Sequence, residues 1–234
     1  MRRRAEHVDQ TRQRIVEASV ALHGSIGLAA TTIAAIADKA GVTRLTVYRH
    51  FPDQTALFNA CSAHWLSQQQ LPDPGAWARI GDPIERLRAG LADLYRYYRA
   101  GADMLIHVYR DFSTMPELHQ QAWRHRDTHH RDVLAAPFGG TGDQRRRICT
   151  VIGHATSFWT WRSLCADQGL SDQDAVQVMA AAVLLALAVM AFELLALAWI
   201  RRRFFGTGFL RSVIAVTLGG AIIATISAAL GAAS

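Results

Sequence analysis

The chain has 234 residues, of which 50% are hydrophobic and 19% are charged. This length allows one large domain or a small and a larger one, and the apolar share excludes wholesale disorder. The formal net charge of +6 and the pI near 9.8 favour a polyanionic partner, either nucleic acid or an anionic membrane surface.

The cysteines and the first residues indicate the compartment. Cys61, Cys149 and Cys165 are widely spaced and form no C-x-x-C pair, which is typical of reduced thiols in a cytoplasmic protein. The arginines in MRRRAEHVDQTRQR are followed by no apolar segment, so this start does not have the pattern of a secretory signal peptide. We therefore expect the N-terminal part of the chain to lie in the cytoplasm.

The N-terminal region predicts two helices joined by a break. Apolar residues recur at helical spacing over residues 9–23, and the stretch GSIGLAAT then interrupts the pattern. Thr31 or Thr32 can cap a second helix, and Gly41 ends it.

A short helix with a polar surface follows Gly41. Thr43 can cap this helix, which ends near residues 51–52, and Asp53 can cap the next one. Two helices joined by a tight glycine turn are typical of a helix-turn-helix, whose second helix enters the major groove of DNA. We therefore predict that this segment reads DNA. An ordinary helical bundle with a solvated polar face is the alternative.

The residue types in the short helix suit contacts with bases and phosphates. Arg44 can bind a guanine edge through two hydrogen bonds, and Leu45 and the Thr46 methyl group can contact a thymine methyl group. Hydroxyl and imidazole groups that can donate to phosphate oxygens belong to Thr32, Tyr48 and His50. A basic arm that adds salt-dependent affinity is formed by Arg2, Arg3, Arg4, Arg12 and Arg14.

The stretch TTIAAIADKAGVTRLTVYRHFPDQTALF resembles the N-terminal domain of the TetR family of bacterial repressors, and the resemblance covers about residues 9–66. The family typically uses the start of its recognition helix for base contacts, which implies that role for Thr43, Arg44, Leu45 and Thr46. The family's phosphate contacts correspond to Thr32, Tyr48 and His50. This chain has Gln54 where the family usually has a phosphate-contacting lysine, so we expect a shallower salt dependence of DNA binding.

The remaining chain predicts longer helices beyond a proline-rich boundary at residues 71–83. Helices are expected over residues 84–99, 102–112, 117–136 and 144–166, and the stretch DQGLSDQD opens a further one. No segment alternates as a strand would. The predicted fold class is therefore all-α, with a DNA-binding domain over residues 1–66 and a helical effector-binding and dimerisation domain over residues 67–190.

Residues 157–184 resemble, more weakly, the last two helices of the TetR family. These helices pair with a second subunit, which implies a homodimer, and a DNA site with two-fold half-sites also requires one. The family binds a small-molecule effector in the same domain. The side chains that could line an effector pocket, or could form ordinary core, are Tyr95, Tyr98, His107, Tyr109, Arg110, Trp123, Phe158 and Trp161.

No metal, cofactor or catalytic site is predicted. His125 and His129 are spaced four apart beside His130, which suits zinc, but Asp127 and Asp132 do not complete a convincing ligand set, and a solvated helix face is preferred. The sequence also lacks a phosphate-binding loop and a nucleophile–base motif. We therefore expect the protein not to be an enzyme.

Residues 191–234 form an apolar tail that a plain TetR-like chain would lack. Residues 178–200 contain one charged side chain, Glu193, and residues 212–234 contain none. Each run exceeds the length of about 20 residues that crosses a bilayer. The tail is therefore a candidate membrane anchor of one or two helices.

Three arrangements of the tail remain open. In the first, residues 176–200 extend the dimer helix, the arginines at 201–203 lie at the cytoplasmic membrane face, and residues 212–232 make a single span. In the second, two spans form a hairpin, which a loose resemblance to the last membrane helices of vacuolar-iron-transporter-like proteins favours. In the third, the tail folds onto the dimer.

The sequence thus predicts a DNA-binding transcriptional regulator. We expect a homodimeric repressor that binds a palindromic operator in double-stranded DNA and is released by an unknown small-molecule effector. The alternatives are a membrane-tethered regulator or sensor, and a membrane protein that carries a DNA-binding module. In each case we expect the DNA-binding domain to lie in the cytoplasm. The tail could also anchor the protein to the inner face of the cell membrane.

Overall fold

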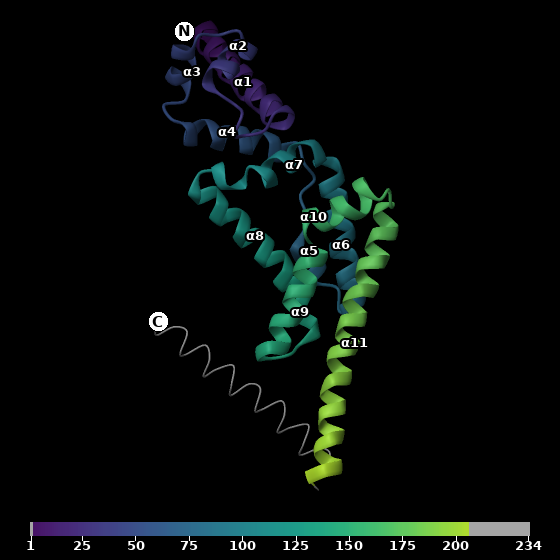
Figure 1. Ribbon diagram of the computed structural model, residues 1–234. Helices are drawn as coiled ribbons and strands as arrows, with labels where there is room; N and C mark the ends of the chain where they lie inside the picture. Colours follow the sequence, from purple (N-terminus) through teal and green to yellow (C-terminus); the bar gives the residue numbers. More distant parts are fainter. Residues whose placement is uncertain (1, 206–234) are drawn as a thin grey trace, which may run out of the picture. The chain divides into compact units, whose positions relative to one another are not determined.

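The structure is a computed structural model that describes residues 2–205, with side chains from residue 8 to residue 203 (Figure 1). Every regular element in this part of the chain is a helix, which confirms the predicted all-α class. The chain forms two compact units, Met1–Pro72 with Arg96–His125 and Asp73–Tyr95 with Arg126–Ser234. The domain boundaries expected at residues 66 and 190 remain predictions. The expected membrane span over residues 212–232 lies outside the described residues.

The first unit contains the helix-turn-helix. Its helices are α1 (Arg2–Ser25), α2 (Ile33–Ala40), α3 (Arg44–His50), α4 (Gln54–Ser67) and α7 (Ala102–Arg110), followed by a short 3-10 helix (Phe112–Thr114) and the first part of α8 (Glu117–Ala135). In Figure 1 the purple and blue helices α1 to α4 lie together, with α3 on the outside. These are the helices that the sequence pattern predicts for this region.

Side-chain caps explain why these helices begin where they do. The Thr32 hydroxyl accepts a hydrogen bond from the Ala35 amide at 3.1 Å, and Thr43 accepts one from the Thr46 amide at 3.2 Å. Asp53 accepts one from the Ala56 amide at 2.7 Å. The turn between α2 and α3 needs a left-handed residue, and Gly41 supplies it with φ 64°. The predicted caps are confirmed, with Thr32 rather than Thr31 at the start of α2.

A small hydrophobic core fixes α3 against α1, α2 and α4. Its buried side chains include Ile15 and Val16 from α1, Ile36 from α2 and Leu57 from α4. From α3 and its C-terminal end come Val47, with no exposed surface, and Phe51, with 2%. Because Val47 points inward, the neighbouring residues of α3 are presented on the opposite side, which positions them for contact with a partner.

The second unit contains the other helices. They are α5 (Pro74–Ala78), α6 (Pro83–Ala100, which ends in the first unit), the rest of α8, a short 3-10 helix (Ala136–Phe138), α9 (Gly142–Ala155), α10 (Phe158–Trp161), a π-helical segment (Arg162–Asp167) and α11 (Asp172–Phe205). Two details differ from the sequence prediction. The expected boundary at residues 71–83 holds the short helix α5, and the helix expected over residues 144–166 is interrupted.

The interruption between α9 and α10 has a local cause. The Thr160 hydroxyl donates to the His154 carbonyl oxygen at 2.7 Å, and the Ser157 hydroxyl accepts a hydrogen bond from the Trp159 amide at 3.2 Å. Both contacts satisfy backbone groups that a continuous helix would bond internally. The chain therefore ends one helix at Ala155 and caps a new one at Ser157.

Aromatic residues hold the second unit together. The Tyr95 hydroxyl donates to the Ala155 carbonyl oxygen at 2.8 Å, and Trp161 Nε1 donates to Asp172 Oδ1 at 2.9 Å at the start of α11. His130, which the sequence placed on a solvated face, is buried on α8 and packs edge-on against Trp77. That expectation was therefore wrong for His130, because Trp77 of the unpredicted helix α5 covers it.

Candidate nucleic-acid interface

The outward face of α3 is the candidate DNA-binding surface. Arg44, Leu45, Tyr48 and Arg49 are exposed, and Leu45 leaves 78% of its surface open. Leu45 therefore contributes little to the hydrophobic core, and its side chain is available for contact with a partner. The face therefore combines apolar, aromatic and basic groups in the open, as a surface that contacts base edges and phosphates requires.

The four predicted base-contacting residues lie together at the start of α3. Arg44 and Leu45 extend freely, whereas the hydroxyl groups of Thr43 and Thr46 lie 2.9 Å apart and share a hydrogen bond. Thr43 also caps the helix, so its hydroxyl is already committed to the fold. Arg44 and Leu45 are thus the side chains with most freedom to read a base, by two hydrogen bonds and by apolar contact with a methyl group respectively.

The predicted phosphate contacts are distributed over α2, α3 and α4. Thr32 accepts from the backbone at the start of α2 and keeps its hydroxyl hydrogen for a donor role. Tyr48 is 52% exposed, and Gln54 is exposed as the first residue of α4. Helix N-termini attract anions, because their first amide groups lack intrahelical partners. Thr32 and Gln54 therefore lie at positions that favour phosphate.

His50 lies at the end of α3, next to basic groups. Partial burial, followed by the charges of Arg49 and Arg12, holds the pKa of His50 below its ordinary value. The neutral imidazole is therefore favoured in the free protein. A phosphate brought close to the ring would oppose the effect of the two guanidinium groups, since an anion stabilises the protonated form.

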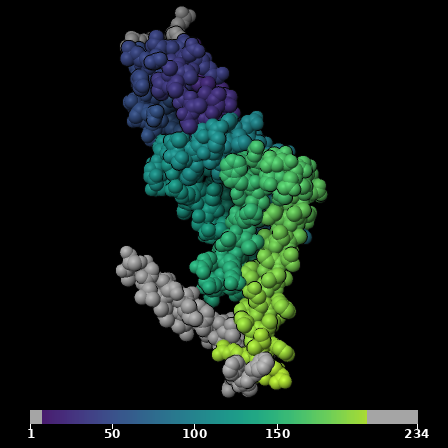
Figure 2. All heavy atoms as spheres, in the orientation of Figure 1, coloured from purple at the N-terminus to yellow at the C-terminus, as the bar shows by residue number. Residues whose placement is uncertain are grey.

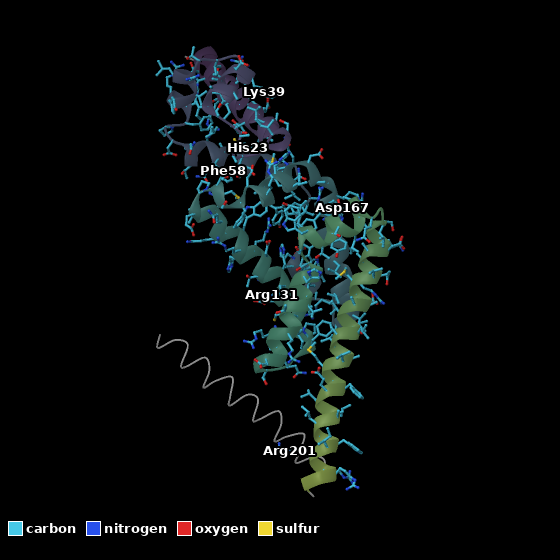
Figure 3. All side chains as sticks on the ribbon, viewed as in Figure 1. His23, Lys39, Phe58, Arg131, Asp167 and Arg201 are labelled. Carbon is cyan, nitrogen blue, oxygen red and sulfur yellow. The ribbon has the colours of Figure 1, made fainter. Side chains whose placement is uncertain are left out.

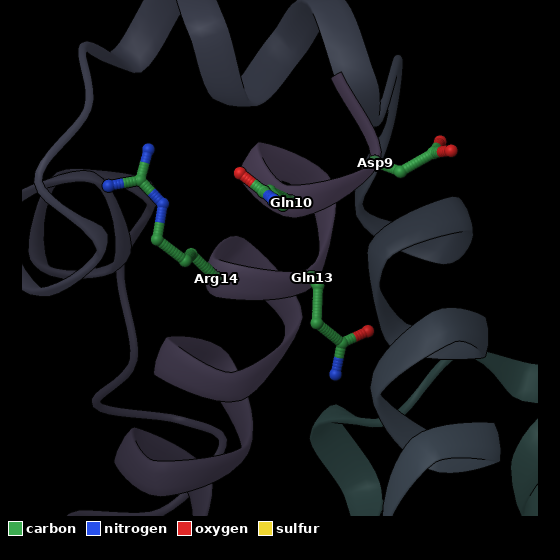
Figure 4. Close-up of a pocket in the computed structure, with 4 residues that line it drawn as sticks. All are labelled: Asp9, Gln10, Gln13 and Arg14. Atoms are coloured by element: carbon green, nitrogen blue, oxygen red, sulfur yellow. The ribbon is translucent and has the colours of Figure 1, made fainter. Parts of the chain in front are cut away.

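The basic arm is described in part. Arg12 lies on α1 with its guanidinium group 4.8 Å from the centre of the Phe51 ring, which brings it close to the end of α3. A shallow hollow on α1 is lined by Asp9, Gln10, Gln13 and Arg14 (Figure 4). The side chains of Gln13 and Arg14 extend from the helix in different directions. The side chains of Arg2, Arg3 and Arg4 lie outside the described residues.

The side chains predicted for an effector pocket are divided between the two units. In the second unit, Tyr95, Phe158 and Trp161 are buried core residues. In the first unit are Tyr98, His107, Tyr109, Arg110 and Trp123, of which Tyr109 and Trp123 pack edge-on with ring centres 5.4 Å apart. The contact of these eight residues with an effector remains a prediction.

A narrow apolar crevice lies within the first unit, between α1, α4, α7 and α8. Trp123 is the member of the predicted set that lines it. The other lining residues are Val20, His23, Leu28, Phe58, Cys61, Ser62, Trp65, Leu66, Met104, Val108 and Met115. Figure 3 labels His23 on α1 and Phe58 on α4, whose rings are 6.4 Å apart. The free cavity measures about 40 Å³, so a ligand of ordinary size could enter only if these helices moved apart.

This crevice was not predicted from the sequence. Its lining side chains are mostly large and apolar, and in a sequence such residues look the same whether they line a crevice or fill a core. The residue types were the available clue, because the lining includes two flexible methionines, Met104 and Met115, together with Trp65 and Trp123.

A charged cluster ties the end of α7 to the loop that leads into α2. The Asp111 carboxylate accepts hydrogen bonds from Arg110 Nε at 2.7 Å and from the Ala29 amide at 3.1 Å, and Arg110 Nη2 donates to the Ile26 carbonyl oxygen at 3.1 Å. The hydrogen bond from Arg110 is the main reason that the pKa of Asp111 falls to about 2. Gly27 has φ 93°, and a Cβ there would collide with Arg110 and Asp111. We call these contacts the α7 latch.

Comparison with known proteins identifies the family. The model described as bacterial regulatory proteins of the tetR family matches residues 15–61, which run from α1 through the candidate interface into α4. Residues 15–61 match the TetR family. This confirms the resemblance seen in the sequence, and the relatives that match are transcription regulators, in agreement with the expectation that the protein is not an enzyme.

Two curated TetR-like relatives match limited stretches. The chain is 42% identical over 62 residues to an Escherichia coli (strain K12) protein described as a repressor of the acrEF/envCD operon, which covers 26% of this chain and 27% of that protein. It is 36% identical over 91 residues to the transcriptional regulator AcrR of Shigella flexneri, which covers 37% and 41% respectively. The matches thus span less than half of either relative.

A solved structure supports the fold over a longer part of the chain. A Clostridium perfringens protein described as a fatty acid metabolism regulator superposes with a TM-score of 0.52, covering 74% of this chain and 97% of that one. The sequences are 16% identical, so this likeness concerns the fold alone.

Proposed function

We propose that this TetR-family protein is a transcriptional repressor that binds a palindromic operator as a homodimer. The observation that carries the proposal is the exposed face of α3, where Leu45 is 78% open to solvent beside Arg44 and Tyr48. This face is open to solvent in the isolated chain, and its groups suit hydrogen bonds and methyl contacts with base edges. The curated relatives, described as a repressor and as HTH-type regulators, support the same reading.

Selection from a random duplex library tests this proposal. The purified full chain, kept in mild detergent because of its apolar tail, should enrich a two-fold symmetric sequence with half-sites about one helical turn apart. A mixture of unrelated duplexes after repeated rounds would contradict it. The net charge of +6 allows non-specific binding, so each round should include competitor DNA at physiological salt.

Release by a small molecule is the second element of the proposal. The crevice of the first unit is lined by α1, α4 and α7, and the α7 latch holds the loop from which Leu28 reaches into that crevice. An apolar ligand that parted these helices would disturb the segments that position α3, and so favour a conformation with weaker DNA affinity. Screening apolar molecules for loss of operator binding tests this step, with the latch variant Asp111→Asn as a comparison.

Membrane tethering is a second candidate role, supported by α11. Among the described residues, Asp172–Arg203 is long and apolar enough to cross a membrane, with a mean hydropathy of 2.5 over its most apolar 18 residues and 22% of that window buried. Residues 212–234 add 23 positions without a charged side chain. Cell fractionation without detergent tests this role. A tethered regulator sediments with membranes, whereas recovery of the full chain in the soluble fraction contradicts tethering.

A further inference from the structure

The long helix α11 loses the cover of its inner face toward its C-terminal end. Val183, Met190 and Leu197 are spaced seven residues apart and lie on the same face, but their exposed fractions rise from 0% through 9% to 52%. The start of α9 marks this change, because Arg147 Nη1 donates to Glu193 Oε2 at 3.0 Å. In Figure 1 α11 continues past that end of α9, and in Figure 2 its yellow-green surface is open to view over much of its length.

The last described residues of α11 expose apolar side chains over a wide arc. We call residues 192–203 the α11 tip. Its large exposed apolar side chains, which are 43% to 70% open, are Phe192, Leu195, Leu197, Trp199 and Ile200. At about 100° per residue they cover about 200° of the helix circumference, and Ala198 is the one buried residue of the tip. Packing against a protein core requires a stripe of roughly 100°, so this wider arc indicates a surrounding apolar medium.

Basic side chains lie at both ends of the exposed arc. The arginines at 201–203 follow it directly and are exposed. At its other end the first turns of α9 supply Arg145, Arg146 and Arg147, the last of which contacts Glu193. Residues 142–147 and 192–203 together contain six arginines against two carboxylates, a net charge of +4. Arginine beside exposed tryptophan and leucine is typical of helices that lie at the surface of an anionic membrane.

Length and charge indicate how the tip meets a bilayer. Phe192 and Ile200 are about 12 Å apart along the helix, which is less than half of the hydrocarbon thickness of about 30 Å. A span over residues 178–200 would instead place Arg147 and Glu193 about 10 Å inside the hydrocarbon, where charged side chains are costly. With the tip lying along the membrane surface, both basic ends stay at the level of the headgroups and the apolar arc reaches the acyl chains.

We propose that the α11 tip docks along the headgroup–acyl boundary of a bilayer that contains anionic phospholipid, with its arginines on the lipid phosphates. The proposal rests on the membrane tethering described under the proposed function, and it specifies the contact and the charge of the lipid. Because α11 itself does not cross, the helix-turn-helix and these arginines remain on one side of the membrane, the cytoplasmic side that the positive-inside rule favours. Any crossing is left to residues beyond Arg203.

A fluorescent label on Leu197→Cys in the full chain tests the docking. After reconstitution into vesicles of phosphatidylcholine and phosphatidylglycerol, its emission should shift to the blue and be quenched by lipid brominated near the headgroup end of the acyl chains. The matched control is Gln177→Cys, exposed near the start of the same helix, whose label should remain accessible to iodide in the water. The unaltered chain, with its three native cysteines, gives the labelling background.

Charge variants test the lipid class. In the labelled chain, Arg202→Gln should lower the docking equilibrium constant about 5-fold, because each arginine near an anionic surface contributes attraction of that size. Arg79→Gln, which removes an exposed arginine at the end of α5, should leave docking unchanged. The measurement is the fraction of label quenched by brominated lipid as the share of phosphatidylglycerol is raised. Equal docking to pure phosphatidylcholine would contradict the recognition of anionic lipid.

Other results would overturn the proposal in distinguishable ways. A chain that floats with vesicles while iodide still quenches the label at 197 would keep the tethering and remove the docking of α11. Shielding from both iodide and brominated lipid would assign the tip to protein contact, with a second copy or with residues 212–234. Quenching of a Val189→Cys label by lipid brominated at the ends of the acyl chains would show that α11 crosses the bilayer. A chain that does not float would remove the tethering itself.

Discussion

At the scale of single residues, DNA affinity and DNA specificity depend on different side chains. In the proposed function Arg44 and Leu45 read the sequence, because bases differ in their acceptors and methyl groups. In the same proposal Thr32, Tyr48 and Gln54 contact phosphates, which would contribute affinity that is nearly independent of sequence. Substitutions at the two groups should therefore have separable effects.

Gln54→Lys should make operator binding more salt-dependent. A lysine at the first position of α4 would release one more counterion per subunit, so the slope of log K against log[salt] should steepen by about 0.9 per subunit, or about 1.8 for a dimer. Titrations of fluorescent operator DNA at several salt concentrations measure the slope. Gln121→Lys, an exposed change of equal charge on α8, serves as the control. Equal slopes for the two variants would remove Gln54 from the interface.

Asp111→Asn should weaken the α7 latch. The substitution leaves Arg110 without its ionised partner and removes a charge-assisted acceptor from the Ala29 amide, so we expect a loss of about 1–3 kcal/mol in the free energy of unfolding. Urea unfolding in mild detergent at pH 7 measures it. Asp103→Asn, on the exposed first turn of the same helix, should change stability by less than about 0.5 kcal/mol.

At the scale of helices, local signals predicted the first unit better than the second. Caps such as Thr32 and Asp53 and the Gly41 turn act within a few residues, so the sequence alone located α2, α3 and α4. The break between α9 and α10 depends on Thr160 reaching back to His154, a contact between positions that helical periodicity treats as continuous. The short helix α5 was missed because its proline-rich sequence resembles a linker.

The residues of the candidate interface could be proposed from the sequence, whereas those of an effector site could not. The α3 residues that face outward are recognised by the absence of any core role, which a sequence shows directly at Arg44 and Leu45. Pocket residues such as Tyr95 and Phe158 look the same in sequence whether they line a cavity or fill a core, because both places require large apolar side chains. Only the packing shows that these two are buried core.

His130 should make α8 sensitive to mild acid. Burial, with smaller contributions from Arg126 and His129 against an opposing one from Asp93, lowers the pKa of His130 from 6.5 to about 4. Between these two values the unfolded chain binds a proton that the folded chain does not, so this stability is complete above pH 6.5 and is lost as the pH falls toward 4. The loss should reach about 3 kcal/mol at most.

Unfolding free energies measured between pH 7 and pH 4 check the role of His130. The variant His130→Gln should lose much of this pH dependence while it starts from a lower stability, since its packing against Trp77 is also changed. The exposed His125→Gln should retain the slope of the unaltered chain. A slope unchanged by His130→Gln would assign the acid sensitivity to other groups.

At the scale of the whole molecule, the chain combines a unit that contains a helix-turn-helix with a second helical unit that includes the long apolar helix α11. The first unit contains the proposed DNA-reading surface on α3 and the α7 latch. The second unit contains α11, which has buried apolar residues on one side and exposed apolar residues elsewhere. A membrane-tethered repressor would need both its operator and the membrane within reach at once, which would couple its activity to its location.

The central claim is that α3 reads a two-fold symmetric DNA sequence through Arg44. Footprinting of the purified full chain on the DNA upstream of its own gene, followed by titration of Arg44→Ala against single-base variants of the protected site, tests it most directly. We predict two protected half-sites about one helical turn apart. Arg44→Ala should cost about 1–3 kcal/mol and lose discrimination at one base position per half-site, whereas Tyr48→Phe should weaken all variants about equally. If Arg44→Ala kept the base preferences of the unaltered chain at every position, the claim would be contradicted.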